Sequence, residues 1–170
     1  MAKDYAQGSV DRDKRLAELL SCPPELQCDA VERLVRQTKL QTKSLKMLRR
    51  LMAPLVAKDL RDQLGNANRS SASRYVAYHC EDGDVSFASG IASELVRLMD
   101  GVSADWVGAI SAGTKAEGGQ LVIVGSSIET INVALSRIAL VVGDYKGGFV
   151  RGLWQGKVSS FSKIAGVILG

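Results

Sequence analysis

The sequence predicts an α+β protein in which a long helical arm precedes a small sheet domain. Up to residue 64, apolar residues recur at the three- and four-residue steps of amphipathic helices. Beyond a polar, small-residue segment at 65–73 (GNANRSSAS), short strand-like runs alternate with helical patterns. We therefore divide the chain into a helical arm at 1–64, a linker at 65–73 and an α+β domain at 74–170.

The arm is expected to hold a short helix followed by a long one. The short helix covers Asp13–Ser21 and ends before two prolines, the second of which, Pro24, is suited to open the next helix. Pro54 lies inside the long helix and should kink it or divide it in two. One apolar stripe is expected to form the packing face of this helix: Val31, Leu34, Leu45, Leu48, Met52, Leu55 and Val56.

The second part has the expected order β-α-β-β-α, then a glycine-rich loop and a final helix. Strands are predicted at 74–79, 106–112 and 120–125, the last two forming a hairpin around a turn at 114–119. A helix at 86–99, capped by Asp84, should turn Ile91, Leu95, Val96 and Leu98 inward. A capping box of Ser126 and Glu129 starts another helix that reaches about residue 142. The loop covers 143–157 and the final helix 159–169.

Scarce residues exclude several classes of chemistry. The chain has 170 residues, of which 46% are apolar, and this is enough to form a core. It contains only one histidine and three cysteines. Cys22, Cys28, His79 and Cys80 make no HxxxH, CxxC or CxxxH spacing, so we expect no metal site and no cofactor. His79 and Cys80 are neighbours on a predicted strand and point to opposite faces, which disfavours a Cys-His catalytic pair. No catalytic residues are assigned.

The same residues bear on location. An odd number of cysteines without a signal peptide indicates a reducing, intracellular compartment, with the cytoplasm favoured and the mitochondrion as the alternative. The longest apolar runs are too short to span a bilayer, so we expect no membrane insertion.

The positive charge is concentrated although the net charge is only +4. No acidic residue lies between Glu32 and Asp59, a stretch that holds eight basic residues. Five of them occupy an arc of about 80° on a helix, nearly opposite the apolar stripe. This row, a candidate contact for phosphates, consists of Arg36, Lys39, Lys43, Lys46 and Arg50. The alternative reading is an ordinary solvated face.

A second basic region coincides with the glycine-rich segment KGGFVRGLWQGK. Glycines let backbone amides approach a phosphate, and the basic and aromatic residues would add charge and a stacking surface. The candidates for nucleic-acid binding here are Lys146, Arg151, Trp154 and Lys157, and the candidate loop residues are Gly147, Gly148, Gly152, Gln155 and Gly156. The segment fits neither a P-loop nor a dinucleotide fingerprint, and a tight structural connection is the alternative.

The two halves together resemble one known family. The segment LAELLSC at 16–22, followed by AVERL at 30–34 and the basic helix, resembles the helical region behind the editing domain of alanyl-tRNA editing proteins. The region ending in KGGFVRGLWQGKVSS is similar to the C-terminal DHH-associated domain that these proteins share with alanyl-tRNA synthetases. Gln155-Gly156 and the upstream Arg151 match the glycine-rich loop of that domain, while the bulky Phe149 and Trp154 depart from it.

The resemblance implies a role in tRNA binding and dimerisation without catalysis. Editing in that family requires zinc-binding HxxxH and CxxxH motifs, which this sequence lacks. We therefore expect a non-catalytic module that binds tRNA or another structured RNA and oligomerises, as a homodimer or as part of a larger complex. The alternative is an accessory subunit of an organellar or ribosomal assembly. For that role, a second apolar strip of Leu40, Met47 and Leu51 beside the first would contact a protein partner.

Overall fold

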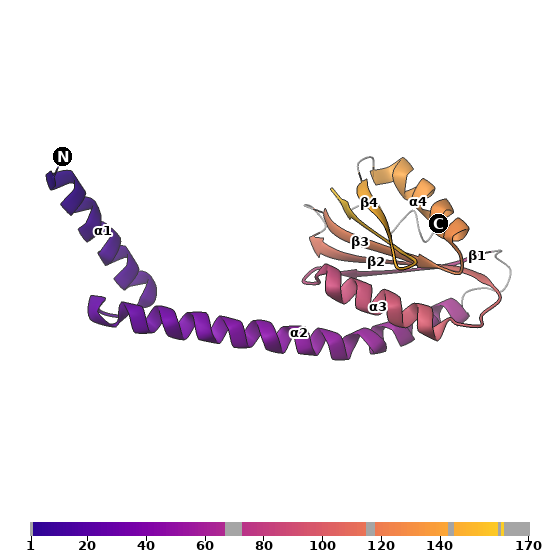
Figure 1. The fold of residues 1–170 in the computed structure, drawn as a ribbon, viewed down its shortest axis with the longest axis horizontal. Coiled ribbons are helices and arrows are strands. Elements are labelled where there is room, and N and C mark those ends of the chain that lie inside the picture. Colours follow the sequence, from indigo (N-terminus) through magenta and orange to yellow (C-terminus); the bar gives the residue numbers. More distant parts are fainter. Residues whose placement is uncertain (1, 67–72, 115–117, 143–144, 160, 162–170) are drawn as a thin grey trace. The chain divides into compact units, whose positions relative to one another are not determined.

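The computed structural model describes residues 2–66, 73–114, 118–142, 145–159 and 161 (Figure 1). It confirms the predicted class, because a long helix is followed by a five-stranded mixed sheet with helices. The chain divides into two compact units, 1–48 and 49–170. This division falls inside the long helix rather than in the segment at 65–73, of which 67–72 lie outside the described residues.

The first unit contains α1 (Ala2–Leu20), a 3-10 helix η1 (Pro24–Leu26) and the start of α2 (Gln27–Asn66). The predicted helix at 13–21 is therefore the last part of a longer helix. Ser21 ends α1 with a left-handed backbone (φ 49°), and the Cys22 N–H donates to the Ala17 carbonyl at 3.2 Å. These are the marks of a Schellman cap, which satisfies carbonyls at the helix end.

Helix α2 is 40 residues long and continues through Pro54, so the proline does not divide it into two helices. Its buried face lies near its C-terminal end and consists of Ala53, Ala57, Leu60 and Leu64. Small alanines let this part of α2 come close to α3 (Val85–Leu98): a Cβ added to Gly90 would lie 3.6 Å from the Ala53 Cβ.

Most of the apolar stripe on α2 is exposed. Only Val56 packs, in part, against the core. The other six residues are 42–64% exposed: Val31, Leu34, Leu45, Leu48, Met52 and Leu55. The pattern correctly located an apolar helix face, and these six side chains are exposed.

The sheet has the strand order β1-β2-β3-β5-β4. β1 (Ser73–Cys80) runs parallel to β2 (Asp105–Thr114), and all other neighbours are antiparallel. β2 and β3 (Gly118–Gly125) form the predicted hairpin, although 115–117 of its turn lie outside the described residues. The remaining strands are β4 (Tyr145–Val150) and β5 (Leu153–Val158).

Helix α3 and the end of α2 cover one face of this sheet. Their core includes the fully buried Ile91 and Leu95 of α3, as predicted, together with sheet residues such as Ile110 and Val122. Val96, predicted to point inward, is 40% exposed. The predicted cap is confirmed, since the Asp84 carboxylate accepts the Phe87 N–H at 2.9 Å.

Helix α4 (Ile128–Val142) covers the opposite face (Figure 1). Alternate residues of β2, such as Val107 and Ala109, belong to this second core, as the two-residue period of a strand requires. The helix starts one residue later than predicted: Ser127 Oγ accepts the Thr130 N–H at 3.2 Å, while Thr130 Oγ1 accepts the Ser127 N–H at 3.0 Å. The predicted final helix at 159–169 falls almost wholly outside the described residues.

Candidate nucleic-acid interface

The cationic row lies on α2, and all five of its side chains are exposed: Arg36, Lys39, Lys43, Lys46 and Arg50. None of them forms an ion pair or a side-chain hydrogen bond with any residue that the structure describes. Like charges one turn apart repel each other mildly on a helix. The row is therefore a surface that an anionic partner would stabilise.

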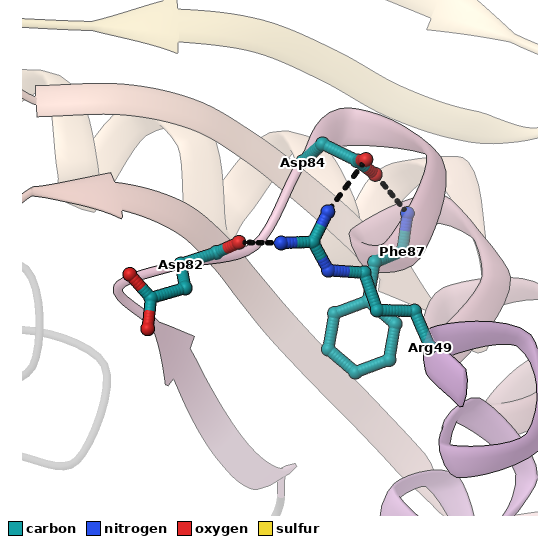
Figure 2. Close-up of polar contacts among 4 residues, drawn as sticks. All are labelled: Arg49, Asp82, Asp84 and Phe87. Atoms are coloured by element: carbon teal, nitrogen blue, oxygen red, sulfur yellow. Dashed lines mark hydrogen bonds and ion pairs between the residues drawn. The ribbon is translucent and has the colours of Figure 1, made fainter. Parts of the chain in front are cut away.

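Arg49, in the same basic stretch, has a different role that the sequence reading missed. Its guanidinium donates to the Asp84 carboxylate at 3.0 Å and also to the Asp82 carbonyl (Figure 2). Arg49 thereby links α2 to the loop that precedes α3. The approach of residues 49 and 84 depends on tertiary packing, so the sequence alone offered no signal for it.

The predicted glycine-rich loop is a β-hairpin. β4 pairs with β5 from Tyr145 opposite Val158 to Val150 opposite Leu153. Two residues join the strands, Arg151 (φ 53°) and Gly152 (φ 80°). Positive φ at both central positions is the mark of a type I′ turn, whose twist matches that of the flanking strands. Strands usually show alternating apolar and polar residues and contain few glycines. This segment does not have that pattern.

Two of the candidate glycines make room for an indole. Gly147 lies directly opposite Gly156. A Cβ on Gly147 would lie 2.6 Å from Trp154 Cζ2, and one on Gly156 would lie 2.8 Å from the same atom. The Trp154 ring therefore lies against both strands where side chains are absent. Gly148, by contrast, has no atom within 4 Å of an added Cβ.

Trp154 does not offer the predicted stacking surface. Its side chain is 4% exposed, belongs to the core under α4 and meets the Tyr145 ring edge-on at 5.5 Å. A base could not reach its face without opening that core. The other candidates of the hairpin differ from it: Lys146, Arg151 and Lys157 are exposed, and Gln155 is partly exposed.

The only histidine of the sequence is half-buried on strand β1. His79 Nδ1 lies 2.9 Å from Ser111 Oγ, and the ring lies against Phe161 at 5.4 Å. Its Nε2 is buried without a hydrogen-bond partner among the described residues. Cys80 packs against the core on the α3 side, whereas Phe161 belongs to the core on the α4 side. His79 and Cys80 thus face opposite sides of the sheet, as predicted.

Two absences concern the residues that the structure describes. No cluster of three or more His, Cys, Asp or Glu side chains suited to hold a metal ion is found there. No helix in that part of the chain combines the length and apolar character needed to cross a membrane. A comparison with models of known protein families gives no match for this chain.

Proposed function

We propose that this protein is a non-catalytic RNA-binding and oligomerisation module, with tRNA as the preferred partner. The observation that carries the proposal is the row of five exposed cations on α2 without a protein counter-charge in the described structure. The resemblance of the sequence to the tail of alanyl-tRNA editing proteins and synthetases is what favours tRNA over other RNAs.

Binding through such a row depends on charge and shape. Lysine and arginine side chains at three- and four-residue steps present their charges along one line, to which a phosphate backbone is the natural complement. Each cation that displaces counterions from phosphates adds to the salt dependence of the affinity. We therefore expect recognition of a folded RNA by its backbone rather than by its base sequence.

Oligomerisation is supported by the uncovered apolar face of α2. Val31, Leu45 and Met52 are separated by multiples of seven residues, and so are Leu34, Leu48 and Leu55. These two series interleave as the a and d positions of a coiled coil. The cationic row then falls at positions b and f, away from the seam. A helix of this design can contact a partner helix and an RNA at the same time.

A second candidate function is an accessory subunit of a larger assembly. It is favoured by Leu40, Met47 and Leu51, which form a second apolar strip and are 61–66% exposed. A helix with two uncovered apolar strips can hold a different protein on each. The mass and composition of the native complex test this candidate: isolation of the protein without any other stably bound chain would exclude it.

A salt titration with matched variants tests RNA binding. Affinity for total tRNA is measured by filter binding at several salt concentrations for the unmodified protein and two double variants. Lys39→Gln with Lys46→Gln removes two charges from the row. Arg61→Gln with Arg97→Gln removes two charges that form ion pairs with Asp62 and Glu94 elsewhere. Glutamine keeps a similar helix propensity in both variants.

The expected result is steep salt dependence, with a slope that falls by about two in the row variant. The control variant should keep the slope of the unmodified protein. Absence of tRNA binding at low salt, or equal loss in both variants, would refute the proposal.

A further inference from the structure

A groove of about 440 Å³ separates α3 from the β4–β5 hairpin. From α3 it is lined by Ser89, Ser93 and Val96, and from the hairpin by Val150, Leu153 and Gln155, with Arg151 at the turn. None of these lining residues is acidic. The groove thus combines a guanidinium, two hydroxyls and an amide with a small apolar surface.

The strand register extends this surface along the hairpin. Residues directly opposite each other in an antiparallel pair share a face, and every second pair shares the same one. Starting from the lining pair Val150 and Leu153, this rule places Gly148 with Gln155, and then Lys146 with Lys157, on the α3 side. Both lysines are exposed. One side of the hairpin therefore carries cations at both ends. About 13 Å of strand separates the lysine pair from the pair Val150 and Leu153 next to the turn.

Two features of this face cost stability in the isolated protein. Lys146 and Lys157 are like charges placed directly opposite each other, which is unfavourable in a sheet. Arg151 has a left-handed backbone (φ 53°), where Asn or Gly would be preferred, and it forms no ion pair with any described residue. An anion bound along this face would reduce the repulsion between the two lysines and would form an ion pair with Arg151.

We propose that this groove and the adjoining hairpin face bind the sugar–phosphate backbone of a short single-stranded RNA segment. Arg151 at one end and the two lysines at the other bind phosphates. Ser89, Ser93 and Gln155 supply hydroxyl and amide groups for the ribose 2′-hydroxyl. Gly148, which has open space in place of a side chain, lets the backbone approach the strand between the two charged ends. The proposal rests on the proposed RNA-binding function but concerns a separate surface from the α2 row.

Binding of a uridine tetraribonucleotide to the full chain tests this site, because so short a probe needs no folded RNA. Two-dimensional amide NMR and a titration of the affinity are used with three variants. Arg151→Asn removes the charge and suits the type I′ turn. Gly148→Val fills the open floor with a residue that strands favour. Arg97→Gln removes a charge of α3 that pairs with Glu94 and does not line the groove.

The expected result is a set of shifts at Ser89, Ser93 and the Gln155 side-chain amide. Affinity should fall at least about fivefold in Arg151→Asn and in Gly148→Val, and stay unchanged in Arg97→Gln. The deoxyribose analogue should bind more weakly than the ribonucleotide.

Three results would overturn the site: no shifts at millimolar probe, shifts confined to α2, or full affinity in Arg151→Asn. The two proposals fail separately. If tRNA binds through the α2 row while the tetranucleotide does not bind, only the groove is excluded. If the tetranucleotide binds in the groove while tRNA does not bind, the tRNA-binding proposal fails and the groove stands.

Discussion

The carboxylate of Asp84 joins Arg49 of α2 to the first turn of α3. One oxygen accepts the arginine N–H at 3.0 Å, and the other accepts the Phe87 N–H at 2.9 Å as the helix cap (Figure 2). The ion pair is partly exposed, with 28% and 42% of the two side chains accessible, so screening by solvent keeps its contribution small. The cap should therefore contribute more to stability than the ion pair.

We predict that Asp84→Ala lowers the free energy of unfolding more than Arg49→Ala. Loss of the cap should cost about 1 kcal/mol, and loss of the exposed pair about 0.5 kcal/mol. Urea denaturation followed by circular dichroism measures both. Asp84→Asn separates the terms because it retains a capping oxygen without the charge. It should cost no more than Arg49→Ala, which also removes the bond to the Asp82 carbonyl. If Asp84→Asn were as damaging as Asp84→Ala, the charge rather than the cap would dominate.

The hairpin glycines should differ sharply in their tolerance of alanine. A Cβ at Gly156 would lie 2.7 Å from the Lys146 carbonyl and 2.8 Å from Trp154 Cζ2. Either the strands or the buried indole must then move, at a cost of about 1–3 kcal/mol. Gly148→Ala is the matched control, because nothing lies within 4 Å of its added Cβ. Equal stability of the two variants in urea would contradict the role assigned to Gly156.

The hairpin also shows why sequence reading located the helices better than the final strands. Periodicity and caps act over a few neighbouring residues, so the positions of α3 and its cap Asp84 could be predicted. β4 is half-buried only at Tyr145 and exposed from Lys146 to Val150, which leaves no alternating pattern. The glycines of β4 indicate a loop when the sequence is considered alone. Gly147 instead makes room for the Trp154 ring, which contacts the strand only after β4 and β5 have paired.

For the candidate site, the positions of the charges could be predicted from the sequence, but the surroundings of individual side chains could not. The five cations of the α2 row are exposed, in agreement with their spacing along one face of a helix. In the part of the chain that the structure describes, no acidic residue close to them in the sequence forms an ion pair with them. The surroundings of Trp154 and Arg49 could not be predicted in this way. Trp154 is buried by residues that are distant in the sequence, and Arg49 forms an ion pair with such a residue. The groove beside α3 is of the same kind, since it depends on the packing of two separate elements.

Tyr78 should make stability sensitive to alkaline pH. Burial raises the pKa of its phenol above 10.0, and the neighbouring Cys80 thiolate raises it further. Because the folded state holds this proton more tightly, the contribution is present below pH 10 and is lost as pH rises through the folded pKa. Urea midpoints should therefore fall in this range, and less so in Tyr78→Phe. Absorbance at alkaline pH should show that Tyr78→Phe removes a late-titrating phenol; unchanged titration would contradict the assignment.

The exposed apolar face of α2 should determine the oligomeric state. Leu45 and Leu48 lie at its centre, 52% and 56% exposed, and fall at successive a and d positions. We expect the protein to be larger in solution than the 18.2 kDa chain. Replacing both leucines by glutamine, which keeps helix propensity close, should reduce the mass toward one chain in light scattering after gel filtration. Leu140→Gln is the control, because Leu140 on α4 is 87% exposed and lies outside this face. A monomeric unmodified protein, or an unchanged mass in the double variant, would show that two copies do not meet along this helix.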